Sequence, residues 1–307
     1  MRQEIYATTI MKPLITVIIP TYNHAHFLRD ALRSVCAQTY ANWEAIVVNN
    51  YSHDDTIEVV NSFGDSRIHL ENFRNYGIIA ASRNRGIKLA TGQYVAFLDS
   101  DDVWYPAKLA RCIARLEEGF DLVCHGLRWE SGGRGRDVFF GPARRATFDS
   151  LLYNGNCIAT SATVVLRDVL ESVGGFSEDS RLVTAEDYHL WIKLSRAGAR
   201  IEFLHEILGE YRLHAGNESG AVLRQMEAVR SVVRSFLDEL PSSSCWARMR
   251  ARRRYGIVYY IAARGMQDKG EFTAAWPMFL RSLRCWPFYA KTYVAIGLNA
   301  IGRGPHS

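Results

Sequence analysis

The stretch YVAFLDSDD, residues 94–102, places three carboxylates within four positions directly after a run of apolar residues. A continuous apolar run is typical of a strand buried in a parallel sheet. Open α/β sheets bind their ligands at the carboxyl ends of such strands. Because neighbouring carboxylates repel each other, the cluster indicates a divalent cation that shares its oxygen ligands with substrate phosphates. An acidic turn in which Asp102 caps the next helix is the alternative that needs no metal.

Segments with strand-like and helix-like patterns alternate around this stretch. Apolar runs predict strands over residues 14–19, 45–48, 67–70 and 94–98, and apolar residues at helical spacing predict helices over 24–37, 54–63 and 78–89. This alternation predicts a doubly wound, mostly parallel, Rossmann-like α/β sheet. Further along, we expect helices over 108–118 and 185–197, strands over 121–125, 162–166, 201–204 and 207–211, and a loop or hairpin turn over 131–137. Beyond residue 220 the pattern is helical, with a break at 241–244.

Composition narrows the class of protein. The chain has 307 residues, of which 48% are hydrophobic and 22% charged, as in ordinary globular enzymes. It has no apolar run of about 18 residues, and its first dozen residues do not resemble a signal peptide. The six cysteines include no Cys-x-x-Cys pair and are expected to be free thiols. We therefore expect a cytoplasmic protein.

Charge is concentrated in the C-terminal region. Residues 221–307 contain 14 Lys or Arg against five Asp or Glu, a formal charge of +9, so residues 1–220 carry −4. Aromatic and basic residues interleave there, a combination that suits peripheral contact with the inner face of an anionic membrane. Packing of the same helices on the catalytic domain or on a second subunit explains the pattern equally well. The sequence does not indicate an oligomeric state. Binding of nucleic acid by the basic residues has no motif to support it, and no nucleic-acid partner is expected.

A set of motifs in a fixed order resembles the family 2 glycosyltransferases of the GT-A fold over roughly residues 13–214. The motifs are VIIPTYN (17–23), VVNNYSHD (47–54), NYG (75–77) with ASRNRGI (81–87), FLDSDD (97–102) followed by Trp104, and GGF (174–176) before EDYHLW (186–191). Several motifs in order are far more specific than any one of them. The resemblance divides the chain into a catalytic domain, residues 1–220, and a helical, basic region, residues 221–307. Within the catalytic domain it implies a nucleotide-sugar-binding half, residues 13–105, and an acceptor-binding half, residues 106–220.

The resemblance implies an enzyme that transfers a sugar from a nucleotide-sugar donor, with a UDP-sugar favoured, to an acceptor hydroxyl with inversion. It also implies a divalent metal cofactor, Mn²⁺ or Mg²⁺. The acceptor would be a glycan or a lipid-linked glycan in the synthesis of a cell-surface polysaccharide or glycolipid. The enzyme would then work in the cytoplasm or peripherally on the inner face of the membrane.

By resemblance, the donor is held by residues at the ends of the first strands: Pro20, Thr21, Tyr22, Asn23, Asn50 and Ser52. Asn23 in this turn is also explained as a cap of the first helix. The family usually has two Asp residues where this chain has Asn49 and Asn50. Asn50 still offers a carbonyl acceptor and an amide donor to a base, but loss of the charge weakens the contact.

The resemblance assigns the carboxylate cluster and three further side chains to the donor and the metal. Asp101 is expected to coordinate the metal, with Asp99 contacting the ribose or a metal-bound water and Ser100 close to the donor. Asp102 would cap the next helix or help to orient the metal. The remaining residues are Arg83 for the diphosphate or base, Arg212 as a clamp on the diphosphate, and His214 as a third metal ligand or a hydrogen-bond donor to the diphosphate.

Two adjacent carboxylates, Glu186 and Asp187, begin a predicted helix. A structural explanation is that acidic residues in a first turn favour the helix dipole. The family has its general base here, and we assign that role to Asp187, with Glu186 orienting the acceptor.

Two other functions fit parts of the pattern. A nucleotidyltransferase would need a Gly-rich basic loop that residues 20–26 lack, and a catalytically silent nucleotide- or glycan-binding scaffold is favoured only by Asn49 and Asn50.

Overall fold

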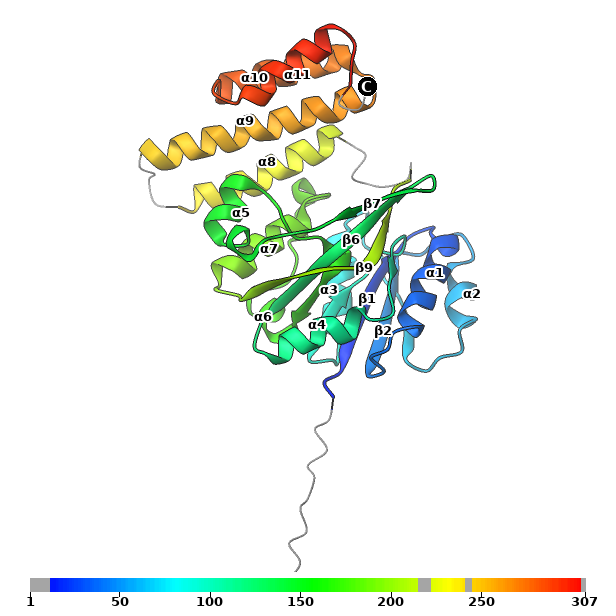
Figure 1. Ribbon diagram of the computed structural model, residues 1–307. Helices are drawn as coiled ribbons and strands as arrows, with labels where there is room; N and C mark the ends of the chain where they lie inside the picture. Colours follow the sequence, from blue (N-terminus) through cyan, green and yellow to red (C-terminus); the bar gives the residue numbers. More distant parts are fainter. Residues whose placement is uncertain (1–11, 215–221, 241–244, 305–307) are drawn as a thin grey trace, which may run out of the picture.

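The computed structural model describes residues 12–214, 222–240 and 245–304, and the predicted break at 241–244 lies outside them. Its centre is a nine-stranded mixed sheet with helices on both faces (Figure 1). The strand order is β3-β2-β1-β4-β8-β6-β9-β5, with β7 paired to β6. The predicted α/β class is confirmed.

The N-terminal half of the sheet is parallel throughout. Its four strands pair in the order β3-β2-β1-β4, and helices connect them in sequence. The elements are β1 (Ile15–Thr21), α1 (Ala25–Cys36), β2 (Trp43–Asn49), α2 (Thr56–Asn61), β3 (Ile68–Asn72), α3 (Ile79–Leu89) and β4 (Tyr94–Phe97). The sequence predicted each of them to within a few residues, because β1, β2 and β4 are rich in apolar residues and the helices repeat apolar residues at helical spacing. This half contains the doubly wound arrangement.

The other half departs from the expectation of a mostly parallel sheet. β8 pairs antiparallel with both β4 and β6, and β5 pairs antiparallel with β9. The elements are β5 (Val103–Trp104), α4 (Lys108–Glu117), β6 (Leu122–Ser131), β7 (Arg134–Val138), α5 (Phe148–Asn154), β8 (Thr163–Leu166), α6 (Arg167–Ser172), α7 (Glu186–Arg196) and β9 (Ile201–Arg212). The two strands expected over 201–211 are one strand, whose register shifts against β6. The Gly- and Arg-rich stretch forms the β6–β7 hairpin.

The sheet divides the interior into two cores, because successive side chains of a strand point to opposite faces. In β1, Ile15, Val17 and Ile19 pack with α1, α2 and α4. Ile18 faces the other side and packs with α3 and α5–α8. The residues of β4 alternate in the same way. A sheet covered on both faces holds its strand ends rigidly, which is where the polar motifs lie.

Four helices follow the sheet: α8 (Val222–Asp238), α9 (Cys245–Asp268), α10 (Phe272–Cys285) and α11 (Ala290–Ala300). They stack above one end of the sheet in Figure 1. Ala228, Val232, Val233 and Phe236 of α8 belong to the core around α5 and α7, and Ala251 and Tyr255 of α9 pack against it. A further cluster joins α9–α11 with Met226 of α8. The expected packing on the catalytic domain is therefore realised for α8 and for part of α9. A boundary at residue 220 stays a prediction. Within the described ranges, no helix has both the length and the apolar character needed to cross a lipid bilayer.

Gly86 sets how closely α3 approaches the sheet. A Cβ atom at this position would lie 2.5 Å from Cγ2 of Ile18 on β1. Real Cβ atoms do not come so close, so only glycine permits the contact without movement of the helix or of Ile18. Arg83 lies almost one turn earlier on the same helix, and its position therefore depends on the same contact.

We expect Gly86→Ala to destabilise the fold by about 1–3 kcal/mol, because the added methyl overpacks a core that is already filled. Urea unfolding measures the change. Gly297→Ala is the matched control, since Gly297 lies in α11 with open space around its Cβ position. That change should be neutral or stabilising by about 1 kcal/mol through helix propensity. Equal stability of Gly86→Ala and the wild type would contradict the tight contact.

Candidate active site

A cleft of about 780 Å³ lies over the carboxyl ends of β1 and β4 and the start of α7. It is lined by most of the residues predicted to form the site: Pro20, Thr21, Tyr22, Asn50, Arg83, Asp99, Ser100, Asp101, Glu186 and Asp187. Residues between 20 and 102 contribute one wall and residues between 156 and 188 another. These residues are thus brought together, although they are separated by up to 167 positions in the chain. The other predicted residues, Asn23, Ser52, Arg212 and His214, do not line the cleft.

The two asparagines that replace the usual Asp pair have different surroundings. Asn49 is fully buried, its Oδ1 accepts from Ser52 N and Oγ (3.0 and 2.7 Å), and its Nδ2 donates to Asn72 Oδ1 (2.9 Å). Asn50 lines the cleft, and its Oδ1 accepts from the backbone N–H of Asn75 (2.9 Å). Asn49 therefore holds the loop, whereas Asn50 is the residue of the pair in reach of a ligand.

Asn23 and Ser52 brace this loop behind the cleft wall. The Asn23 N–H donates to Ser52 Oγ (2.9 Å), and Asn23 Oδ1 accepts from His53 N (2.8 Å). The alternative that Asn23 caps the first helix is wrong, because Asp54 Oδ2 accepts from Ala25 N (2.8 Å) at that position. The side chain that performs the capping lies 29 residues away, so no local capping signal could identify it.

Backbone strain is concentrated around the cleft. Asn23, Tyr51, Tyr76 and Thr184 have positive φ angles of 53°, 55°, 53° and 82°. Such angles are unusual for residues other than glycine, and for β-branched Thr they are exceptional. Asn23 follows β1, Tyr51 follows β2 and Tyr76 precedes α3, while Thr184 lies two residues before Glu186. Strained residues often gather at functional sites, where the surrounding structure maintains them.

Of the carboxylates after β4, Asp99 and Asp101 are half-buried and Asp102 is buried. Asp101 Oδ2 lies 3.0 Å from His214 Nε2, and burial together with the charge of Asp99 raises the pKa of Asp101. Asp102 is only 1% exposed, and its Oδ1 accepts from Arg212 N (3.2 Å). Burial and the neighbouring carboxylates raise its pKa well above the ordinary value. The expectation that Asp102 caps the next helix is wrong, because α4 begins six residues later, at Lys108.

This cluster fits a divalent cation only in part. Across the part of the chain that the structure describes, no three His, Cys, Asp or Glu side chains are gathered into a preformed cation site. The Asp101–His214 contact, however, joins two side chains with ligand chemistry at the cleft, and the raised pKa of Asp101 reflects negative charge that a cation would offset. Mg²⁺ and similar ions commonly take one or two protein ligands and complete their shell with phosphates and water. The donor set fits that mode.

Arg83 joins the two walls of the cleft. Its Nη2 donates to Asp99 Oδ1 (2.7 Å) and its Nη1 to Glu186 Oε1 (2.6 Å), while the side chain is almost fully buried. Burial alone would lower the pKa of Arg83, but the charges of Asp99 and Glu186 outweigh it and raise the pKa. The resemblance assigned Arg83 to the donor diphosphate or base. In the structure its guanidinium is already paired with carboxylates from both sides.

Of the two acidic residues that begin α7, Asp187 has the properties of a base. Its Oδ2 accepts from Thr160 Oγ1 (3.1 Å) and its Oδ1 from the N–H of Tyr188 (2.6 Å). Burial, and next the charge of Glu186, raise its pKa to about 7, although Arg83 acts in the opposite direction. A carboxylate tuned to this range can take up a proton near neutral pH. Glu186 is instead paired with Arg83.

The last predicted residues, Arg212 and His214, lie on the segment that leaves β9. Arg212 Nη1 lies 3.1 Å from Asp30 Oδ2 on α1. The His214 ring stacks on Phe27. Sequence reasoning missed His24, whose Nδ1 lies 3.0 Å from Ser100 Oγ and which lines the cleft. It also missed Ser161, whose Oγ accepts from the N–H of Asp99 (3.1 Å). Neither residue belongs to a motif, and only the fold brings them near the carboxylates.

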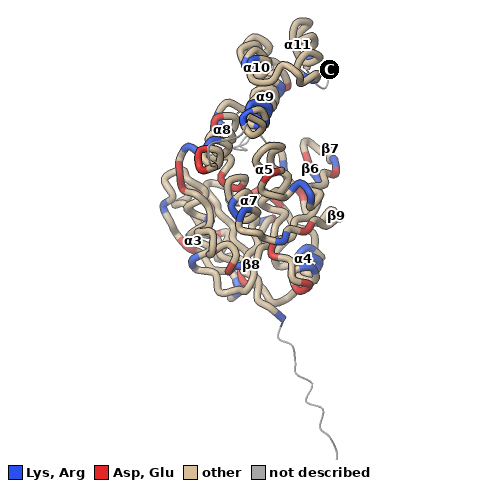
Figure 2. The backbone as a smooth tube through the Cα atoms, turned by 90° about the vertical axis from the view of Figure 1, so that its left-hand side faces the viewer, with Lys and Arg blue, Asp and Glu red and all other residues tan. Residues whose placement is uncertain are grey.

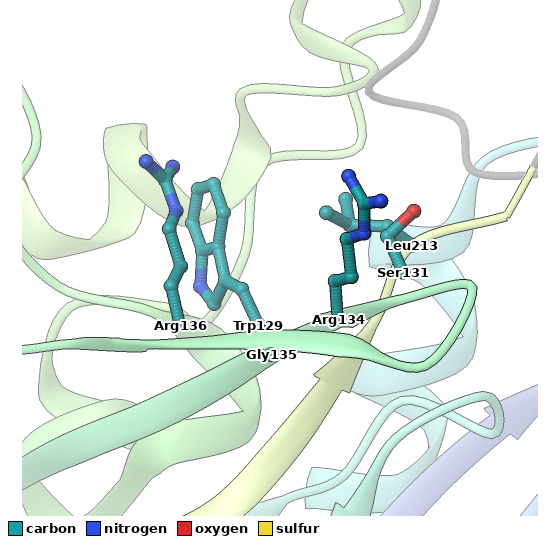
Figure 3. Close-up of a pocket in the computed structure, with 6 residues that line it drawn as sticks. All are labelled: Trp129, Ser131, Arg134, Gly135, Arg136 and Leu213. Atoms are coloured by element: carbon teal, nitrogen blue, oxygen red, sulfur yellow. The ribbon is translucent and has the colours of Figure 1, made fainter.

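The cleft continues toward the β6–β7 hairpin. A smaller pocket there shares Trp129 and Leu213 with the main cleft. Figure 3 shows the guanidinium of Arg136 beside the Trp129 ring, with Arg134 next to Leu213. The Arg136 guanidinium lies 4.9 Å from the ring centroid, a cation–π distance. An aromatic face bordered by guanidinium groups suits a polar, ring-shaped or anionic ligand.

Comparisons with known proteins agree with this geometry. The Glycosyl transferase family 2 profile matches residues 16–174. The chain is 32% identical over 227 residues to the Escherichia coli UDP-Glc:alpha-D-GlcNAc-diphosphoundecaprenol beta-1,3-glucosyltransferase WfgD, covering 73% of this chain and 87% of that protein.

Two solved structures have the same fold. One is Staphylococcus aureus TarS, residues 1–349, in complex with UDP-GlcNAc, with a TM-score of 0.63 and 17% identity, covering 94% of this chain and 92% of the other. The second is the Pyrobaculum calidifontis mannosyltransferase PcManGT with GDP-Man and Mn²⁺, with a TM-score of 0.59 and 18% identity, covering 95% and 86%. Together with the family match, these similarities establish that the chain belongs to glycosyl transferase family 2 and is a glycosyltransferase with the GT-A fold.

Proposed function

We propose that this glycosyltransferase moves a sugar from a UDP-sugar to a hydroxyl of a lipid-linked glycan, with inversion at the anomeric carbon, during synthesis of a cell-surface polysaccharide. The observation that carries the proposal is the opposition of two carboxylate groups across one cleft. Asp99 and Asp101 lie at the end of β4, and Asp187, with its raised pKa, begins α7. The name of the E. coli relative, with its UDP-Glc donor and diphosphoundecaprenol-linked acceptor, supports the choice of substrates.

The proposed reaction is a single displacement. Tyr22 and Asn50 contact the base, and the diphosphate lies at the end of β4. Asp187 accepts the proton of the acceptor hydroxyl as its oxygen attacks the anomeric carbon from the side opposite the diphosphate. Attack from that side inverts the configuration. Glu186 pairs with Arg83, and this ion pair fixes the start of α7. Thr160 and the Tyr188 N–H orient the carboxylate of Asp187.

A divalent cation held by Asp101 and His214, with Asp99 nearby, would offset the negative charge that grows on the departing nucleoside diphosphate. The solved mannosyltransferase with GDP-Man and Mn²⁺ supports a role for such an ion in the fold. Contact of the C-terminal helices with a membrane stays a prediction. It draws on the exposed side chains of Phe288, Val294 and Ile301 and on the Arg residues along α9 (Figure 2). Co-sedimentation with anionic vesicles would test it.

A catalytically silent scaffold is the competing function. It draws on Asn49 and Asn50, and of these only Asn50 lines the cleft. The pKa of Asp187 argues against it, because a binding scaffold has no use for a carboxylate that titrates near neutral pH.

Donor and metal binding can be tested by thermal unfolding with UDP, GDP and dTDP, each with and without Mg²⁺. We expect UDP with Mg²⁺ at about 100 times its Kd to stabilise the protein by about 2.7 kcal/mol, a rise of several degrees in Tm. Asp101→Asn should lose the metal-dependent part of the shift. Equal shifts with and without Mg²⁺ in both proteins would contradict the ligand role of Asp101. No shift with any nucleotide, in folded protein, would favour the silent scaffold.

The role of Asp187 predicts the effect of pH and of its replacement. Because the base must be ionised, kcat/KM for the acceptor should fall as the pH drops below about 7. Asp187→Asn should keep donor binding and lose transfer by about 10²–10⁴-fold. Near-normal turnover would mean that another residue is the base.

The raised pKa of Asp187 also makes the stability of the fold depend on pH. The folded state keeps the Asp187 proton up to about pH 7, whereas the unfolded chain releases it near pH 4, so stability from this group is lost as the pH rises between these values. Asp187→Asn should therefore have a higher Tm than the wild type at pH 8 and a clearly smaller advantage at pH 5. The exposed Asp168→Asn in the first turn of α6 is the control and should show no such pH-dependent gain.

A further inference from the structure

Arg254 is a buried cation at the wall of the cleft, and it comes from α9, far outside the family match. Its side chain lines the cleft with Asn156, Gln225 and Tyr188, and the residue is only 4% exposed. Its one hydrogen bond within the described ranges goes from Nη2 to the hydroxyl of Tyr188 (3.4 Å), and its Nε has no partner there. The described residues offer it no carboxylate within ion-pair distance.

The neighbouring arginines of α9 are partnered differently. Arg250 forms a two-nitrogen ion pair with Asp149 of α5, and Arg253 Nη1 donates to Asn154 Oδ1 (3.2 Å). These contacts attach α9 to α5 and fix the position of the helix over the cleft. Arg254 is therefore held in place by its neighbours rather than by an ion pair of its own.

The chain leaves room for this guanidinium at Gly155, just after α5. A Cβ atom at Gly155 would lie 3.2 Å from both Nη1 and Nη2 of Arg254, and the φ of +101° is one that other residues rarely adopt. The guanidinium thus lies directly over backbone. Glycine serves two needs here, the turn after α5 and the space for Arg254.

A buried guanidinium without a counter-charge is costly, and it cannot lose its proton as Lys or His would. Such a cost is offset when a bound ligand supplies the negative charge. Tyr188, which Arg254 contacts, directly follows Asp187, and all three residues line the same cleft. In the proposed function an acceptor that reaches Asp187 therefore enters the cleft that Arg254 lines. Guanidinium groups are well suited to carboxylate and phosphate groups.

We propose that Arg254 binds an oxyanion of the acceptor, a phosphate or carboxylate close to the sugar that is glycosylated. The assignment of this wall to the acceptor rests on the proposed function; the anion site itself rests on Arg254. A C-terminal helix outside the family match thereby supplies a determinant of acceptor specificity.

The test uses the full-length chain and inorganic phosphate as the probe, with Mg²⁺ and saturating UDP so that the donor side is filled, at ionic strength matched with chloride. We expect phosphate to raise the Tm of the wild type by about 2–4 °C and to leave Arg254→Gln unchanged. Arg252→Gln, an exposed residue of the same helix, should respond as the wild type does. If Arg254→Gln does not fold, Arg254→Met, which fills similar volume without charge, replaces it.

Equal stabilisation of wild type and Arg254→Gln, or of neither, would overturn the proposal. If the proposed function fails instead, UDP would give no shift in Tm, while the rise in Tm caused by phosphate would still depend on Arg254.

Kinetics with three acceptors then distinguish a phosphate from a carboxylate as the anion. The acceptors are an alkyl N-acetylglucosaminide, its diphosphate-linked counterpart and an alkyl glucuronide. Arg254→Gln should lower kcat/KM by about 10–100-fold for one charged acceptor and change the neutral one little. An equal loss for all three would also overturn the proposal.

Discussion

The double ion pair of Arg83 is the interaction on which the rest of the site depends. It joins Asp99, at the end of β4, to Glu186, at the start of α7, through a guanidinium that is almost fully buried. Breaking a buried ion pair by removing one partner leaves an uncompensated charge and lowers the free energy of unfolding by roughly 3–5 kcal/mol. Gly86, on the same helix as Arg83, lets α3 lie close against β1. This contact in the core therefore helps to position Arg83 between the two walls.

The same bridge couples the electrostatics of the two walls. Asp187 is raised to a pKa of about 7 by burial and by Glu186, and Arg83 limits that rise. Asp101 is raised by burial and by Asp99. Each wall therefore carries a carboxylate whose negative charge is costly. A bound cation can offset that charge at Asp101, and uptake of a proton can remove it at Asp187. Arg254 adds the opposite case, a buried positive charge at the wall of the same cleft.

The sequence was informative where structure follows from local pattern. Apolar runs identified the parallel strands, and the carboxylates of residues 99–102 were correctly expected at a strand end. Two features were not predictable from pattern. The second half of the sheet is mixed because β8, an apolar strand of four residues, pairs antiparallel with both neighbours, and periodicity carries no direction. Contacts between residues far apart in the chain leave no local signal: Asp54 with Ala25, Thr160 with Asp187, Ser161 with Asp99, and Arg254 with Tyr188.

The most direct test of the coupling is the pH dependence of transfer in Arg83→Gln. Glutamine keeps a hydrogen-bond donor but removes the charge that holds down the pKa of Asp187. The account predicts that the acid limb of kcat/KM for the acceptor moves upward from about pH 7 by about one unit or more, because a nearby opposite charge typically lowers the pKa of a carboxyl group by about that much. An acid limb that stays where it is in the wild type, in a folded variant, would contradict the claim that Arg83 links the donor wall to the base.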